Sequence, residues 1–87
     1  MAEFIVYTKD NCPYCTAAKM KLRDLGHSVV EKRVDEDETL FDELKELAPD
    51  ARTVPQIFVK SYRIGGYDQL DSLIRSNMLE MTIDMAS

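Results

Sequence analysis

The 87-residue chain carries 16 acidic and 11 basic side chains, a net charge of −5 and an apolar fraction of 45%. We therefore expect one small domain over residues 1–87, without nucleic acid as a partner. No apolar run approaches the roughly 20 residues that cross a bilayer, and residues 1–10 lack the basic and apolar regions of a signal peptide, which predicts a cytoplasmic protein that does not bind membranes.

The first part of the chain predicts a strand, a helix and a second strand. Residues 3–8, EFIVYT, form the short apolar run of a buried strand. A helix is expected over 13–25, ending at Gly26, because Ala17, Met20, Lys21 and Leu25 recur at helical spacing and Leu22 widens their stripe. Residues 28–34, SVVEKRV, predict the second strand. Because a helix joins the two strands, we expect them to be parallel.

The second part predicts a helix, a hairpin and a closing helix. Residues 35–48 begin with capping acids and carry an apolar stripe of Leu40, Phe41, Leu44, Leu47 and Ala48. Residues 55–59 and 62–65 predict an antiparallel hairpin. An amphipathic helix is expected over 67–79, and the tail over 80–87 extends it or frays, with Met78, Met81 and Met85 packed on the core. The order β-α-β-α-β-β-α predicts an α/β fold, a mixed four-stranded sheet with helices on both faces.

The only two cysteines, Cys12 and Cys15, lie at the start of the first expected helix. Pro13 suits the first helical position, so both sulfurs share the first turn, within the separation that a disulfide tolerates. The unpaired N–H groups of a helix start stabilise a thiolate, and Lys9 adds positive charge. We therefore expect the pKa of Cys12 to lie below the free value of about 8.5. Cys15 lies deeper, which assigns attack to Cys12 and resolution to Cys15.

Two other roles for the cysteine pair are less favoured. A disulfide that closes so short a loop adds little chain-entropy stabilisation. Two cysteines supply only half of the ligands of a structural zinc site, and His27, the only histidine, is expected in a surface loop at the far end of the helix. We expect no metal site within one chain, whereas a cluster shared between two chains with outside thiols stays open.

Acidic residues are spread unevenly along the chain. Residues 31–50 hold nine of the 16 acidic side chains and three of the 11 basic ones. An acidic cluster of this kind is usually a solvated face. The segments around the cysteines and around Pro55 lie outside this acidic cluster, so a small anionic ligand could approach there.

Three stretches resemble the glutaredoxin family of the dithiol kind: CPYC at 12–15, TVPQIFV at 53–59 and GGYDQL at 65–70. The resemblance covers residues 3–77, and the chain is similar to compact bacterial or phage members. It implies a thioredoxin-like fold in which the Val54–Pro55 bond is cis and faces the cysteines. The free backbone N–H and C=O of Val54 can then pair with an extended substrate.

The resemblance also implies a glutathione site. The family contacts, carried over position by position, are Lys9, Tyr14, Arg52, Thr53, Val54, Pro55, Gly66, Tyr67 and Asp68. The first three match the glycine end of the tripeptide, the 53–54 segment its cysteinyl part, and the 66–68 segment its γ-glutamyl end, where helix N–H groups suit a carboxylate. Asp42 stands where many family members carry a glutamine near the ligand, so we expect weaker binding of glutathione on that side.

The function implied by the resemblance is a glutathione-dependent thiol–disulfide oxidoreductase. The Cys12 thiolate attacks a protein or glutathione mixed disulfide, Cys15 resolves it, and two glutathiones restore the dithiol. We expect no bound cofactor, a monomer, and protein disulfide partners that include ribonucleotide reductase. The alternatives are a thioredoxin-like reductant recharged by a flavoprotein reductase, an iron–sulfur carrier, or a binding module that uses the Val54 edge.

Overall fold

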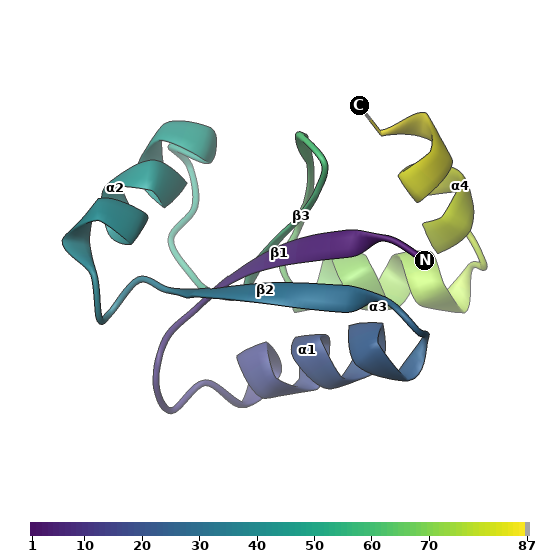
Figure 1. The fold of residues 1–87 in the computed structure, drawn as a ribbon, viewed down its shortest axis with the longest axis horizontal. Helices are drawn as coiled ribbons and strands as arrows, with labels where there is room; N and C mark the ends of the chain where they lie inside the picture. The colour runs from purple at the N-terminus through teal and green to yellow at the C-terminus, as the bar shows by residue number, and fades with distance from the viewer. Residues whose placement is uncertain (87) are drawn as a thin grey trace.

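The computed structural model describes residues 1–86, and its centre is a mixed sheet of four strands (Figure 1). These are β1 (Glu3–Thr8), β2 (Ser28–Arg33), β3 (Gln56–Val59) and β4 (Tyr62–Gly65). They lie in the order β2-β1-β3-β4. Strand β1 pairs parallel with β2 and antiparallel with β3, and β3 pairs antiparallel with β4. The predicted mixed sheet and its hairpin are confirmed.

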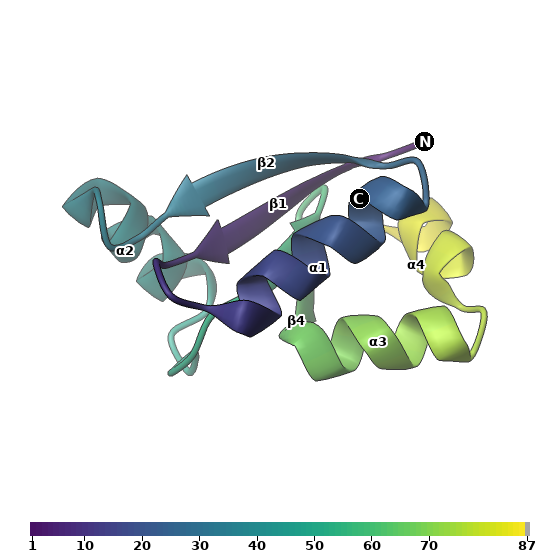
Figure 2. The same cartoon turned by 90° about the horizontal axis from the view of Figure 1, so that it is seen from below.

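The sheet is covered on both faces by helices. The helices are α1 (Pro13–Asp24), α2 (Glu38–Leu47), α3 (Tyr67–Arg75) and α4 (Leu79–Met85). Helices α1 and α3 lie side by side on one face, and α2 lies on the other (Figure 2). Among residues 1–86, no helix is long and apolar enough to span a membrane.

Alternation along the strands divides the core into two clusters. In β3, Ile57 and Val59 face α1, α3 and α4, whereas Phe58 faces α2. The larger cluster comprises Phe4, Val6, Ala18, Leu22, Ile57, Val59, Ile64, Leu70, Leu79 and Ile83. The smaller cluster comprises Tyr7, Leu44, Ala48, Ala51 and Phe58.

The predicted apolar stripes of α1 and α2 are wider than the faces that these helices bury. Helix α1 buries Ala18 and Leu22, while Met20 is 57% exposed. Helix α2 buries Leu44, followed by Ala48 at its C-cap, while Phe41 is 46% exposed. Each helix buries one narrow face of residues three or four positions apart, which in α1 also includes Cys15, so the flanking apolar residues stay at the surface.

The prediction of a single helix over 67–79 is wrong, because α3 ends at Arg75 and a separate helix begins at Leu79. Asn77 takes a left-handed conformation with φ of 62°. Its N–H donates to the Ile74 carbonyl at 3.1 Å, and the Met78 N–H donates to the Leu73 carbonyl at 2.8 Å. These two bonds form a Schellman motif. The predicted stop of α1 at Gly26 uses the same pair of bonds and is confirmed.

The separate helix α4 also corrects the expected packing of the methionines. Leu79 and Ile83 occupy the buried positions of α4, with 5% and 8% of their surface exposed. Met78, Met81 and Met85 therefore point outward, and they are 39%, 53% and 78% exposed.

Candidate active site

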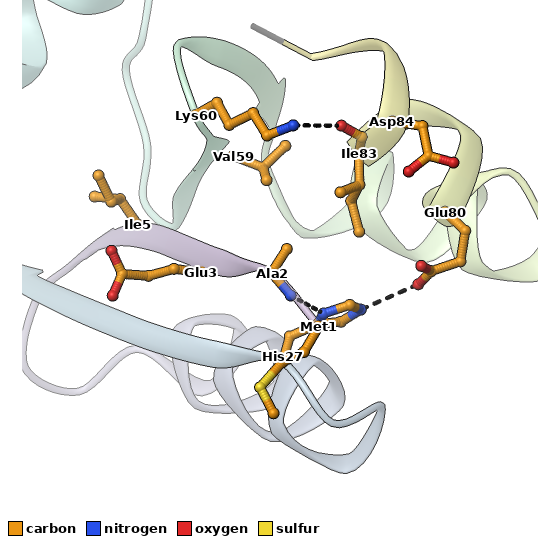
Figure 3. A pocket seen from close by; sticks show the side chains of 10 residues that line it. All are labelled: Met1, Ala2, Glu3, Ile5, His27, Val59, Lys60, Glu80, Ile83 and Asp84. Carbon is orange, nitrogen blue, oxygen red and sulfur yellow. Dashed lines mark hydrogen bonds and ion pairs between the residues drawn. The ribbon is translucent and has the colours of Figure 1, made fainter.

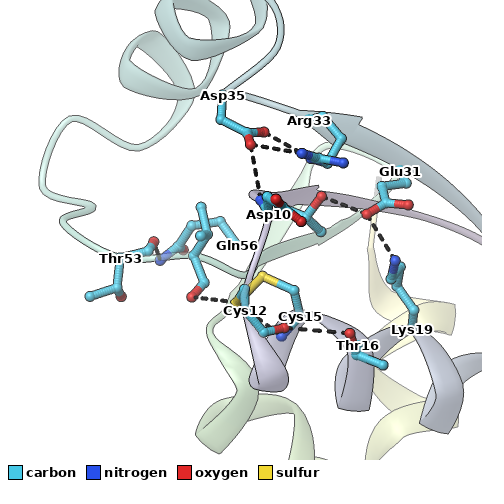
Figure 4. The surroundings of a disulfide bond; sticks show 12 residues. Asp10, Cys12, Cys15, Thr16, Lys19, Glu31, Arg33, Asp35, Thr53 and Gln56 are labelled. Carbon is cyan, nitrogen blue, oxygen red and sulfur yellow. Dashed lines mark hydrogen bonds and ion pairs between the residues drawn. A yellow bond between two sulfur atoms is a disulfide. The ribbon is translucent and has the colours of Figure 1, made fainter.

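The two cysteines form a disulfide at the first turn of α1 (Figure 4). Their Cα atoms are 5.2 Å apart. Cys12 is the N-cap residue of the helix, and the backbone N–H of Cys15 donates to its Sγ at 3.1 Å. Cys12 is partly exposed, whereas only 2% of the Cys15 surface is accessible. The pair is therefore unequal, with the accessible sulfur at the positive end of the helix.

The turn that leads into Cys12 is held by a carboxylate from the turn that follows β2. Asp35 accepts the Asp10 N–H at 3.0 Å and the Arg33 guanidinium at 2.8 and 2.7 Å (Figure 4). The Arg33 and Asp10 hydrogen bonds hold the pKa of Asp35 well below its usual range. Asn11 adopts a left-handed φ of 54°, which asparagine tolerates better than most residues. The backbone directly before Cys12 is thereby tied to the end of β2.

A second carboxylate fastens α1 to the sheet. Glu31 accepts the Oγ1–H of the buried Thr8 at 2.7 Å and the ammonium of Lys19 at 2.8 Å. Burial works to raise the pKa of Glu31, but the Lys19 and Thr8 hydrogen bonds outweigh it, so the pKa lies below its ordinary value. These contacts join β1, β2 and α1 next to the redox pair.

A cis Val54–Pro55 bond faces the redox pair, as predicted. The Sγ of Cys12 lies 3.6 Å from the Val54 carbonyl oxygen. The side chain of Gln56, which is 5% exposed, donates to the Thr53 carbonyl at 3.0 Å and accepts from Arg63. Gln56 was not predicted as a site residue, because a glutamine at a strand start gives no distinctive signal.

A pocket of about 210 Å³ opens beside Val54, whose carbonyl oxygen lies next to the Cys12 sulfur, and we call it the Tyr14 pocket. The rings of Tyr14 and Tyr67 form one wall, with centroids 5.3 Å apart. The structure brings seven of the nine predicted glutathione residues together here, namely Tyr14, Thr53, Val54, Pro55, Gly66, Tyr67 and Asp68.

Gln69 also lines the Tyr14 pocket and was missed by the sequence prediction. Its Oε1 accepts the Gly66 N–H at 2.9 Å, the side-chain half of a capping box. The spacing of Gly66 and Gln69 was the available signal. Within residues 1–86, the N–H groups of Tyr67 and Asp68 have no protein acceptor, so they remain available at the helix start.

A second cavity, of about 270 Å³, lies on the other side of Val54, and we call it the Phe41 hollow. It shares Thr53 and Val54 with the Tyr14 pocket and holds the remaining two predicted residues, Lys9 and Arg52. Its apolar lining is formed by Val34, Phe41, Leu44, Ala51 and Val54. Asp42 is exposed and lines neither cavity.

A larger cavity, of about 460 Å³, lies at the opposite end of β1 (Figure 3). It contains none of the predicted site residues. His27 lines it and is 6% exposed, so the expected surface-loop histidine is wrong. Its Nδ1 accepts the Ala2 N–H at 3.0 Å, and its Nε2 lies 3.2 Å from Glu80. The unpredicted helix α4 brings Glu80 to this place. Across residues 1–86, no group of three or more His, Cys, Asp or Glu side chains is placed to hold a metal ion.

A redox disulfide on the first turn of a helix, facing a cis-proline peptide of a mixed four-stranded sheet, defines a thioredoxin-like thiol–disulfide oxidoreductase. The glutaredoxin family model matches residues 4–64. Glutaredoxin 3 of Escherichia coli K12 is 40% identical over 73 residues, which are 84% of this chain and 87% of that protein. The chain belongs to the glutaredoxin family.

Solved structures agree with this assignment. A glutaredoxin from Brucella melitensis superposes with a TM-score of 0.78 at 34% identity, over 95% of this chain and 89% of that one. A buckwheat glutaredoxin–glutathione complex superposes with a TM-score of 0.74 at 26% identity, over 93% of this chain and 76% of that one.

Proposed function

We propose that this glutaredoxin is reduced by glutathione, which it binds in the Tyr14 pocket. The observation that carries the proposal is the position of this pocket, which shares Val54 with the surroundings of the Cys12 sulfur. The buckwheat relative in complex with glutathione supports it.

Each part of the tripeptide has a chemically suitable partner around Val54. The cysteinyl part lies along Thr53 and Val54, which places its sulfur beside Cys12. The γ-glutamyl carboxylate accepts N–H groups at the start of α3, and the Asp68 carboxylate accepts from the α-amino group. Pro55 and Gly66 shape the base of the pocket. The glycine carboxylate reaches Lys9 and Arg52 across the shared segment.

The proposed reaction transfers two electrons through the cysteine pair. The Cys12 thiolate attacks one sulfur of the substrate disulfide, and the other sulfur leaves as a thiolate that takes a proton. Cys15, after losing its proton, attacks the Cys12 sulfur and releases the second substrate thiol. One glutathione thiolate then opens the Cys12–Cys15 disulfide, and a second glutathione releases the first as oxidised glutathione. The net result is one substrate disulfide reduced and two glutathiones oxidised.

The decisive experiment is turnover of a glutathione mixed disulfide with glutathione and glutathione reductase. We expect Cys12→Ser to abolish turnover and Cys15→Ser to retain it, because glutathione itself can release the mixed disulfide on Cys12. Tyr14→Ala should raise KM several-fold. Tyr62→Ala, which changes a half-exposed tyrosine outside the pocket, is the matched control. Turnover with a flavoprotein thioredoxin reductase and none with glutathione would refute glutathione as the donor.

Ribonucleotide reductase is the protein client that we propose, on the strength of family membership alone. Dithiol-dependent turnover of that enzyme should need both Cys12 and Cys15. We further propose that the protein acts as a monomer in the cytoplasm. Sedimentation at micromolar concentration tests the first part, and cell fractionation tests the second.

A further inference from the structure

The Phe41 hollow has apolar walls that glutathione does not need. Glutathione consists of γ-glutamyl, cysteinyl and glycyl residues and has no large apolar side chain. Its glycine carboxylate can reach Lys9 and Arg52 without filling the space beside Phe41. Phe41 leaves 46% of its surface in solvent although Val34 and Leu44 lie in the same cavity. Five apolar residues converge on this cavity, and a cavity with mainly apolar walls and a few polar groups is the usual form of a binding site.

The charged side chains that line the Phe41 hollow are all basic, although the protein as a whole is acidic. The chain has a net charge of −5, yet none of the described residues that line the hollow is acidic. Lys9, Arg52 and Lys45 line it, and the Lys45 ammonium already donates to the Ala51 carbonyl at 2.7 Å. Lys9 and Arg52 therefore remain as the cations that a carboxylate from outside can meet.

The position of the hollow relates it to the reacting sulfur. Val54 lines the hollow, and its carbonyl oxygen lies 3.6 Å from the Cys12 Sγ. An extended chain advances by about 3.3 Å per residue. When a client segment lies along Val54 in the direction proposed for glutathione, with its cysteine at Cys12, a side chain one or two residues after that cysteine reaches the hollow.

We propose that the Phe41 hollow selects protein disulfides in which a large apolar residue and then a carboxylate follow the reacting cysteine. The apolar side chain packs against Phe41, Val34 and Leu44, and the carboxylate pairs with Lys9 and Arg52. This inference names the class of protein substrate for the proposed function. It rests on that function in one respect, namely that substrates bind along the backbone of Val54. It does not depend on glutathione as the donor.

The test is a single turnover of protein that has been reduced with dithiothreitol and desalted, so glutathione is absent. Symmetric disulfide dimers of three short peptides are the oxidants, with Cys-Leu-Glu, Cys-Ala-Glu or Cys-Leu-Lys at the centre. Each turnover forms the Cys12–Cys15 disulfide and releases two peptide thiols, which are counted after acid quenching. For the wild type, we expect the Leu-Glu peptide to react about tenfold faster than the Ala-Glu peptide. The Leu-Lys peptide should react several-fold more slowly than the Leu-Glu peptide, and this difference should shrink at high salt.

The variant Phe41→Ala should bring the Leu-Glu and Ala-Glu rates to within about twofold of each other. Leu47→Ala is the matched control, because Leu47 is on the same helix, is 54% exposed and does not line the hollow. Equal rates for the Leu-Glu and Ala-Glu peptides on the wild type would overturn the proposal, even if Phe41→Ala did not fold. Equal loss of selectivity in Leu47→Ala would overturn it too. Loss of glutathione-linked turnover, by contrast, would refute the donor and leave this result intact.

Discussion

The first turn of α1 makes the two sulfurs unequal, and alkylation rates can measure the inequality. In Cys15→Ser, Cys12 keeps its place at the helix start. It also keeps the backbone N–H of residue 15 as a donor, which lies 3.1 Å from its sulfur. In Cys12→Ser, the remaining thiol of Cys15 is 2% exposed. The two single-cysteine variants therefore report each sulfur alone.

The size of the effect follows from the contacts of Cys12. A hydrogen bond to a charged group contributes about 1.5–3 kcal/mol, and the helix start adds about 0.3–1 kcal/mol. Both lower the pKa of the Cys12 thiol. A free thiol is only a few per cent ionised at pH 7, so full ionisation raises the thiolate fraction roughly thirtyfold. Intrinsic nucleophilicity falls as the pKa falls, which leaves a gain of a few-fold over a free thiol.

The assay follows iodoacetamide alkylation of both variants between pH 5 and 9 by mass spectrometry, with free cysteine as the reference. We expect Cys12 to react more than about tenfold faster than Cys15 at pH 7, because Cys15 is both buried and without a stabilising donor. Its advantage over free cysteine should grow below pH 7, where the reference loses its thiolate about tenfold per pH unit. A Cys12 rate that follows the pH profile of free cysteine would refute the reasoning.

Three further predictions concern the residues that hold the site. Glu31→Gln should lower the free energy of unfolding by about 1 kcal/mol at pH 7, because it removes the negative charge that strengthens the hydrogen bonds from Thr8 and Lys19. Since the folded-state pKa of Glu31 is lowered, the stability difference between wild type and Glu31→Gln is present above the ordinary glutamate pKa of 4.5 and is lost as the pH falls through the folded-state pKa. Urea unfolding at pH 7 and at pH 3 measures this stability difference. The same difference at both pH values would contradict the prediction. Gln56→Ala releases the Thr53 carbonyl and should raise KM for a glutathione mixed disulfide several-fold with kcat within twofold; steady-state kinetics that show a fall in kcat alone would argue against a positioning role. His27→Ala should cost about 2–3 kcal/mol of stability, measured by urea unfolding, and leave Cys12 alkylation unchanged, because His27 lies at the opposite end of β1.

The elements up to residue 65 could be predicted to within a few residues because their signals are local. Pro13 and Gly26 mark the two ends of α1, and the structure uses both as expected. Asp37 caps α2 by accepting the Thr39 N–H at 2.9 Å, as the run of acids predicts. Strand alternation and the helix crossover then determine the parallel pair of the sheet.

The C-terminal part could not be predicted as well, because two signals conflict there. The apolar spacing from Leu70 to Met78 continues through Asn77, whereas asparagine at this place permits the left-handed turn that ends the helix. The turn brings α4 to the N-terminal end of β1 and places Glu80 beside His27 (Figure 3). One missed turn therefore accounts for two errors, the exposed histidine and the buried methionines.

Phe41 belongs to the predicted apolar stripe of α2, and the structure leaves it half-exposed. Its spacing to Leu44 suggests one buried face, but Leu44 alone takes the core position of α2, and Phe41 lies at the adjacent hollow. The same segment, Thr53 and Val54, lines the Tyr14 pocket on one side and the Phe41 hollow on the other. If both proposals hold, Tyr14→Ala should weaken turnover with glutathione, and Phe41→Ala should change only the selection of protein disulfides, because Tyr14 lines one cavity and Phe41 the other.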